Sequence, residues 1–237
     1  MSAADRTIAA MFIAAGVLSL LVWAYLVLGR GGFWRMQAAS AWGAQIIPAR
    51  IAVIIPARNE ADVVGRAIRS LLQQTGQKAV HIFLVDDSSA DGTAQAARDA
   101  AIIEGQAEKL TVISGASLPL GWSGKLWAMQ QGIEHAAALA PDFYLFTDAD
   151  IEHSPDSVST LVSITQVGAY DMASLMVRLH CQSLAEKLLI PAFVYFFFKL
   201  YPPAWIASPR HAEAGAAGGC ILMRPAALAK AGGIEAI

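Results

Sequence analysis

Charged residues are scarce in this chain. They make up 15% of its 237 residues, whereas an ordinary soluble domain carries about 25%. Hydrophobic residues reach 56%, and the net charge is −2. No basic stripe occurs, so we expect no nucleic-acid partner, because binding to phosphate backbones requires clustered positive charge. The shortage of charge points instead to a membrane.

Cysteine motifs and glycine-rich phosphate loops are also missing. Cys181 and Cys220 lie far apart without a C-x-x-C pattern, which argues against a zinc site or a disulfide framework. We expect two buried free thiols in a reducing compartment. The segment Gly121–Lys125 resembles a P-loop only in part. Pro119 replaces its first glycine, and Leu126 replaces the serine or threonine after the lysine. No dinucleotide-binding G-x-G-x-x-G motif follows a strand.

One long uncharged stretch lies near the N-terminus, from Ile8 to Leu28. As a helix it would be about 30 Å long, the thickness of a bilayer core. We predict a transmembrane anchor over residues 1–32 and a linker over residues 33–50. A cleaved signal peptide, the alternative, would have a shorter apolar region. Arginines are more frequent after the span than before it, which places the C-terminal side in the cytoplasm and the anchor in the inner membrane.

Strand and helix patterns alternate over residues 51–237. Short apolar runs predict four strands, at residues 51–55, 81–85, 110–113 and 143–147. Helical periodicity or capping residues follow each run, and residues 216–223 resemble another strand before a short helix. Such alternation predicts an α/β fold, with a mainly parallel sheet and helices on both faces.

A second apolar region extends from Leu188 to Trp205 and is rich in aromatic residues. Pro191, Lys199 and the Pro202-Pro203 pair are expected to break it, and its uncharged part is too short to span a bilayer. Aromatic residues beside lysine are typical of a segment at the headgroup level. We therefore predict that residues 186–206 lie on the membrane surface, with a buried core helix as the alternative.

Polar residues follow three of the predicted strands, where the carboxyl ends of a parallel sheet form a ligand-binding edge. They are Glu60 after the first strand, Asp86 and Asp87 after the second, and Asp148 and Asp150 after the fourth. Acids gathered at one edge repel one another unless a cation compensates. A nucleotide diphosphate with a divalent metal would do so.

Asp148 and Asp150 have the spacing to reach one metal, and oxygen ligands suit Mg²⁺ or Mn²⁺. Lys125 can offer a positive charge to phosphate. For other residues, a structural role is a simpler interpretation than a role in binding. Asp91 is expected to be a turn or N-cap residue, and the Asp86-Asp87 pair could form a turn. The histidines are interpreted as structural, and only His153 is close to the site.

Taken together, IIPARNEADVV, FLVDDSSADGT, GWSGKLWAMQQG and FTDADIEHSP resemble the inverting glycosyltransferases of family 2, which have the GT-A fold. The resemblance covers Ile51 to Ile237. The N-terminal span, IPAFVYFFFKLYPPAW and AGGCILMRPAALAKAGG further resemble the hopene-associated glycosyltransferases of hopanoid gene clusters, and they are similar to ceramide glucosyltransferases. A sugar nucleotidyltransferase would need a glycine-rich loop in place of PARNEAD.

The resemblance implies a nucleotide-sugar donor, a lipid acceptor, and roles for individual residues. Pro56, Glu60 and Asp87 would line the nucleoside pocket with Asp86 beside them. Lys125 would approach the pyrophosphate, and Asp148 with Asp150 would form the metal-binding D-x-D motif.

The family places its general base shortly after the element at residues 216–233. We therefore expect the base beyond Ile237, no catalytic base within this chain, and a domain that is incomplete at its C-terminus. The alternative is a catalytically silent module that binds only the donor.

Overall fold

The computed structural model describes residues 2–35, 47–77 and 79–236, so part of the predicted linker over residues 33–50 lies outside the described residues. Two compact units make up the chain. The first combines Met1–Ala38 with Arg178–Gly215, and the second combines Ala39–Val177 with Ala216–Ile237. The segment from Arg178 to Gly215 thus belongs to the same unit as the N-terminal helix.

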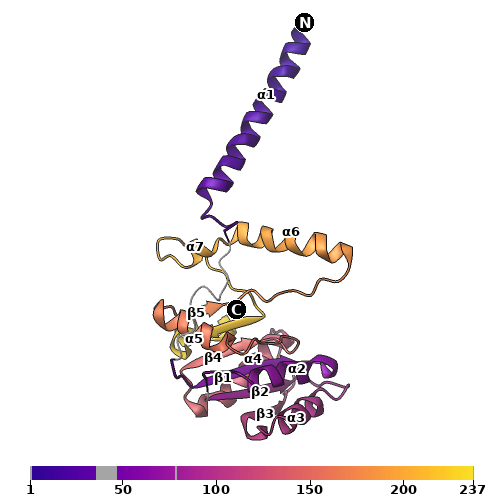
Figure 1. The fold of residues 1–237 in the computed structure, drawn as a ribbon, viewed down its shortest axis with the longest axis vertical. Helices are drawn as coiled ribbons and strands as arrows, with labels where there is room; N and C mark the ends of the chain where they lie inside the picture. Colours follow the sequence, from indigo (N-terminus) through magenta and orange to yellow (C-terminus); the bar gives the residue numbers. More distant parts are fainter. Residues whose placement is uncertain (1, 36–46, 78, 237) are drawn as a thin grey trace. The chain divides into compact units, whose positions relative to one another are not determined.

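The second unit is built on a six-stranded sheet in the order β3-β2-β1-β4-β6-β5 (Figure 1). Neighbouring strands among β3, β2, β1 and β4 pair in parallel, and β6 pairs antiparallel with both β4 and β5. The predicted mainly parallel sheet is confirmed. The strands are β1 (Ile51–Ala57), β2 (Val80–Asp86), β3 (Leu110–Ser114), β4 (Phe143–Thr147), β5 (Met172–Ser174) and β6 (Cys220–Met223).

Helices cover both faces of this sheet, as predicted. Alternate residues of β1 point to opposite faces, so Val53 and Ile55 enter one core cluster and Ala52 and Ile54 enter the other. The first cluster includes residues of α2 (Ala61–Leu72), α3 (Thr93–Ile103) and α5 (Ser157–Val167). The second includes residues of α4 (Gly124–Ala136), α8 (Pro225–Lys230) and the 3₁₀ turn η5 (Ile234–Ala236). Two further 3₁₀ turns are η3 (Ala107–Lys109) and η4 (Ala137–Leu139).

Strand β1 continues through Pro56 to Ala57, although the sequence predicted that it would end at Pro56. The N–H of Ile51 donates to the carbonyl of Ala79, and the carbonyl of Ala57 accepts from the N–H of Asp87. Both partners lie on the β2 side, so the even-numbered residues of β1 face β4. Pairing with β4 stops at Ile54. The missing N–H of Pro56 therefore faces no strand partner, and the proline is tolerated.

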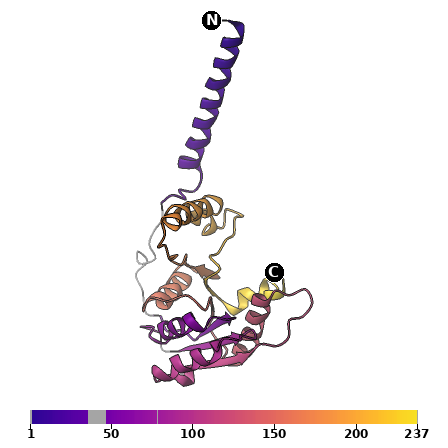
Figure 2. The same ribbon diagram turned by 90° about the vertical axis from the view of Figure 1, so that its right-hand side faces the viewer.

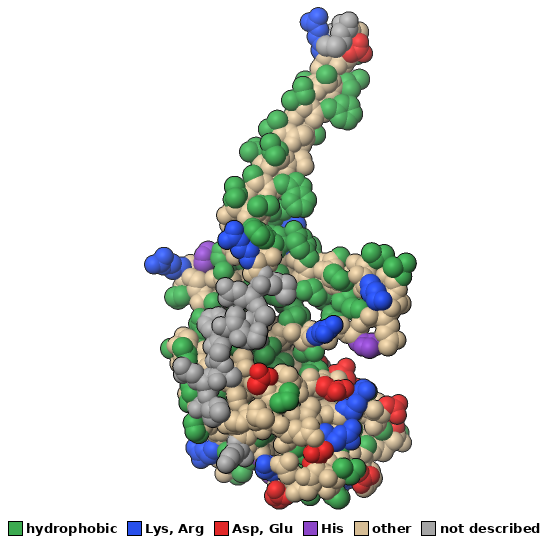
Figure 3. Space-filling model, in the orientation of Figure 1, with side chains coloured by type: hydrophobic (Ala, Val, Ile, Leu, Met, Phe, Trp, Pro, Cys, Tyr) green, Lys and Arg blue, Asp and Glu red, His purple; other side chains and the backbone are tan. Residues whose placement is uncertain are grey.

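The first unit contains α1 (Ala3–Ala24), continued by the π-helical turn η1 (Tyr25–Gly29), and the helices α6 (Leu184–Leu200) and α7 (Pro203–Ile206). Helix α1 is one unbroken helix in both views (Figures 1 and 2), and hydrophobic side chains cover its length (Figure 3). By length and composition, two helical stretches among the described residues could cross a membrane, Ala4–Gly29 and Leu184–Ile206.

Pro191 does not break α6, contrary to the sequence-based expectation. It lies inside a continuous helix of 17 residues that begins with a capping box at Ser183 and Glu186. The proline removes one helical hydrogen bond, to the carbonyl of Lys187, and the helix retains its remaining turns. The helix ends at Leu200, because Pro202 disfavours the α conformation for the preceding Tyr201.

The loop after the N-terminal helix caps the end of α6. Arg30 donates hydrogen bonds from Nε to the carbonyl of Lys199 and from Nη2 to that of Leu200, each at 3.0 Å. Its guanidinium also lies 4.6 Å from the centre of the Trp205 ring, which stacks on His211. The last carbonyls of a helix lack intrahelical donors, so Arg30 satisfies groups that the helix leaves open.

Candidate functional site

Lys125 and Asp148 meet at the carboxyl edge of the sheet. Asp148 follows β4, and Lys125 lies in the first turn of α4. Lys125 Nζ donates to Asp148 Oδ1 at 2.5 Å, with side-chain exposures of 53% and 35%. Two residues 23 positions apart, predicted for phosphate and for metal, are therefore in direct contact at a solvent-accessible edge.

Asp87 lies beside the start of the same helix. A Cβ added to Gly124 would lie 3.0 Å from Asp87 Oδ2, so the first turn of α4 lies close against this carboxylate. Arg58 Nη1 lies 3.4 Å from the same oxygen. Arg58 was not predicted from the sequence as a site residue, although it directly follows β1.

Asp86 is engaged within its own turn. Its Oδ1 accepts a hydrogen bond from the backbone of Ser89 at 3.0 Å, and its carbonyl accepts one from Gly115 at 2.9 Å. Ser88 has a φ of 58°, an uncommon conformation for a residue other than glycine. The carboxylate of Asp86 therefore holds the turn that presents Asp87.

Asp91 has the structural role that the sequence indicated. Its two carboxylate oxygens accept from the backbone of Ala61 at 3.0 Å and from Thr93 Oγ1 at 2.6 Å. These hydrogen bonds, that of Thr93 most strongly, hold the pKa of Asp91 below its usual range. The residue ties the β2–α3 loop to the beginning of α2.

The pKa of Glu60 reflects the negative charge gathered at this edge. Burial raises the pKa of its carboxyl above the ordinary value, and the negative charges of Asp150, Asp91 and Asp148 raise it further. Each of these acids disfavours ionisation of Glu60, as expected where carboxylates gather. A bound cation would relieve this repulsion.

A buried histidine fixes the loop that carries Asp148 and Asp150. His153 Nε2 lies 3.0 Å from Thr147 Oγ1, at the end of β4, and Nδ1 lies 3.3 Å from Ser157 Oγ, in the first turn of α5. Burial lowers the pKa of His153 to about 4, so the ring is neutral at physiological pH. Its interpretation as structural agrees with these contacts.

The hydrogen-bond partners of His153 indicate which of its two ring nitrogens carries the proton. Ser157 Oγ donates to Gln74 Oε1, so it accepts from Nδ1–H of His153, and Nε2 accepts from the hydroxyl of Thr147. The backbone N–H of His153 donates to Ser70 Oγ at 2.9 Å. The side-chain amide of Gln74 donates to the carbonyl of Ser154 at 2.8 Å. The β4–α5 loop is thereby fastened to the last turn of α2 and to the residues that follow it.

The carboxylates at this edge fit a metal that is shared with a ligand. Among the described residues, no group of three or more His, Cys, Asp or Glu side chains could hold a metal ion alone. Mg²⁺ is usually bound by one or two carboxylates together with substrate phosphates and water. Asp148 and Asp150 supply that number of oxygen-donor side chains.

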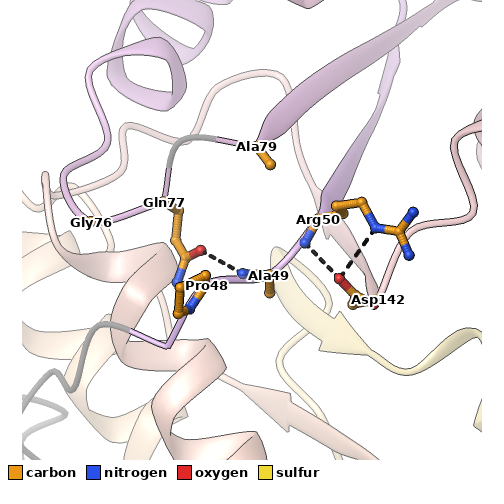
Figure 4. A pocket seen from close by; sticks show the side chains of 7 residues that line it. All are labelled: Pro48, Ala49, Arg50, Gly76, Gln77, Ala79 and Asp142. Carbon is orange, nitrogen blue, oxygen red and sulfur yellow. Dashed lines mark hydrogen bonds and ion pairs between the residues drawn. The ribbon is translucent and has the colours of Figure 1, made fainter.

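A separate hollow of about 400 Å³ lies at the opposite edge, where β1 and β2 begin (Figure 4). Gln77 Oε1 accepts from the backbone of Ala49 beside it, and Arg50 pairs with Asp142 at 3.5 Å. Since ligands of open parallel sheets bind at the carboxyl ends of the strands, we do not assign this hollow to the site. Its lining residues are Pro48, Ala49, Arg50, Gly76, Gln77, Ala79 and Asp142.

Similar proteins share the fold and part of the sequence. A 4,4'-diaponeurosporenoate glycosyltransferase of Staphylococcus aureus is 34% identical over 118 residues, which cover 49% of this chain and only 28% of that protein. The mannosyltransferase PcManGT of Pyrobaculum calidifontis, solved with GDP-Man and Mn²⁺, has a TM-score of 0.61 at 20% identity. That match covers 92% of this chain and 57% of the other, and it supports the predicted GT-A-like fold. Residues 52–232, more than half of the chain, match the family Glycosyl transferase family 2. The chain belongs to glycosyl transferase family 2.

Proposed function

We propose that this chain is the donor-binding part of a membrane-bound glycosyltransferase. The enzyme transfers a sugar, with inversion, from a nucleotide diphosphate sugar to a lipid acceptor, with hopanoids as the first class to test. The observation that carries this proposal is the contact of Lys125 with Asp148, beside Asp87, at the carboxyl edge of the sheet. Family membership supports the reaction class.

Each residue at the edge has a role in the proposal. Pro56, Glu60 and Asp87 surround the nucleoside, with Asp86 shaping the turn beside it. Lys125 binds the diphosphate as a point charge. Asp148 and Asp150 hold Mg²⁺ or Mn²⁺, which when bound neutralises charge on the leaving diphosphate. None of these residues is assigned as the general base.

Membrane attachment is the second part of the proposal. Residues 1–32 form an uncleaved anchor in the inner membrane, residues 33–50 form a linker, and residues 51–237 form the glycosyltransferase domain on the cytoplasmic side. Within that stretch of sequence, residues 186–206, which belong to the compact unit of the N-terminal helix, lie on the membrane surface. The exposed apolar residues of α6 support this placement. The lipid acceptor is supported by the staphylococcal relative, which is named a 4,4'-diaponeurosporenoate glycosyltransferase.

Calorimetric titration of the purified chain with nucleoside diphosphates, with and without Mn²⁺, tests donor binding. We expect Asp148→Ala and Asp150→Ala each to weaken metal-dependent binding at least tenfold. Asp99→Ala, which removes a carboxylate from α3, should leave binding unchanged. Equal binding by all three variants and the unaltered chain would refute the metal site. Incubation with labelled donors and a lipid extract then tests transfer, and binding without transfer would favour the donor-binding module.

A further inference from the structure

We propose that the loop between β3 and α4, residues 115–122, is a second membrane contact that docks the donor-binding unit on a lipid surface. This inference rests on the proposed membrane anchoring and adds a contact within the second unit. It follows from the composition, exposure and rigidity of the loop.

The loop is neutral and apolar at its tip. Residues 114–124 contain no charged side chain. Leu120 is 104% exposed and Leu118 is 53% exposed, although leucine is among the residues most often buried. Without charge, the tip can enter a lipid surface with no ion to desolvate.

A tight turn holds this tip in place. The backbone N–H of Trp122 donates to the carbonyl of Pro119 at 3.3 Å, and Gly121 has a φ of 88°. A positive φ at the third position is the requirement of a type II turn, which glycine meets without strain. Leu120 is therefore held at the apex of a defined turn.

The base of the loop is fastened to α4. The backbone N–H of Ala116 donates to Gln131 Oε1 at 2.7 Å, and its carbonyl accepts from Trp127 Nε1 at 3.1 Å. The Trp122 and Trp127 rings meet edge to face at 5.3 Å. Because its base is fixed, the loop does not need to be ordered on binding, and tryptophan beside the tip is typical of membrane interfaces.

A lipid surface fits this tip better than a protein partner does. A stable protein interface uses about 20–30 residues on each side, whereas two leucines provide a small contact. Attachment through α1, a candidate span of 26 residues, would make docking intramolecular, so even a weak insertion becomes effective. Lys125 lies three residues after the end of the loop, so docking the tip places the donor edge next to the lipid.

The test uses the full chain in vesicles that contain lipids carrying a nitroxide quencher. A fluorophore is attached to Leu120→Cys in a Cys181→Ser background. Cys220 is buried, and burial raises the pKa of its thiol to about 11, so it resists labelling. The matched control is Ile103→Cys, at the end of α3, where the native side chain is 73% exposed. We expect quenching at position 120 to exceed that at position 103 at least twofold.

Equal quenching at the two positions would overturn the proposal. Energy transfer between labelled copies, without quenching by lipid, would also overturn it and would identify a second copy of the chain as the partner. Sedimentation with vesicles tests the anchor separately. A chain that sediments without quenching at position 120 refutes only the loop contact, whereas a chain that fails to sediment refutes the anchoring as well.

Discussion

Lys125 is the residue that joins the two halves of the candidate site, since it contacts Asp148 while the neighbouring Gly124 packs against Asp87. We expect Lys125→Ala to weaken nucleoside diphosphate binding roughly tenfold or more, because hydrogen bonds to charged groups contribute about 1.5–3 kcal/mol. Calorimetric titration measures this loss. Lys109→Ala, which removes a lysine from η3, is the control. A similar loss of affinity in both variants would mean that the overall positive charge of the chain, and not the position of Lys125, is responsible.

His153 makes stability depend on pH. Its pKa is about 4 in the folded chain against an ordinary 6.5. Between these two pH values the imidazole is protonated in the unfolded state but neutral in the folded state. The resulting stability is fully present above pH 6.5 and is lost as the pH falls towards 4. The loss amounts to about 3 kcal/mol.

Thermal unfolding between pH 4 and 7, followed by circular dichroism in detergent, measures this dependence. His153→Gln removes the titrating ring while leaving polar atoms, so its stability should change less across the same range. His135→Gln, on the exposed side of α4, is the comparison. Equal slopes for the unaltered chain and His153→Gln would contradict the prediction.

The gathering of the candidate site residues at one sheet edge could be predicted from sequence, but not their mutual contacts. Asp87 and Asp148 stood out because each follows an apolar strand run, and parallel strands bring their carboxyl ends to one edge. The engagement of Asp86 with Ser89 and the pairing of Arg58 with Asp87 depend on loop conformations. Residues with positive φ, such as Ser88 and Asn59, shape these loops without leaving a periodic signal.

At the scale of elements, Gly132 sets how closely α4 packs on the sheet. A Cβ there would lie 2.6 Å from Ile54 Cγ2, so Gly132→Ala forces the helix or the sheet to move. We expect a loss of about 1–3 kcal/mol in the free energy of unfolding, as for other overpacked cores.

In α2, a Cβ on Gly65 meets no atom closer than 3.8 Å. Gly65→Ala should therefore be neutral or stabilising by up to about 1 kcal/mol.

Chemical denaturation of the two glycine variants measures these differences in the free energy of unfolding, with the variants compared at the same dependence of that free energy on denaturant concentration. Equal stability of the two variants would show that α4 can shift at no cost, and the packing argument would then fail.

Element type was predictable where the periodicity was strong. The apolar runs at residues 51–55 and 143–147 became buried central strands, and α2 has the apolar stripe that the sequence showed. Strand β5 was missed because three residues are too few for a period to appear. The continuity of α6 was also missed. A proline inside a helix costs about 3 kcal/mol, which argued for a break, and the sequence alone does not show the ring contact of Phe197 with Tyr201 at the end of this helix.

At the scale of the whole molecule, the anchor should be retained. The stretch Ala4–Gly29 is long enough to span a bilayer, whereas a signal peptide has a shorter apolar region. We expect the mass of the purified chain to include the N-terminal helix, and we expect the chain to remain in the membrane pellet after an alkaline carbonate wash. Release into the supernatant, or a mass lacking the first 30 or so residues, would refute the anchor.

The two segments of the first unit are far apart in sequence, and Arg30 joins them. It donates to the carbonyls of Lys199 and Leu200, 169 and 170 positions away, so no local pattern could have predicted the contact. Arg30→Gln should free the end of α6 and loosen the segment up to Gly215, with a local loss of about 1–3 kcal/mol. Limited proteolysis should then cut residues 201–215 faster than in Arg35→Gln. Arg35 contacts the ring of Trp34, so its loss should spare α6, and equal cleavage of the two variants would show that Arg30 does not hold the unit together.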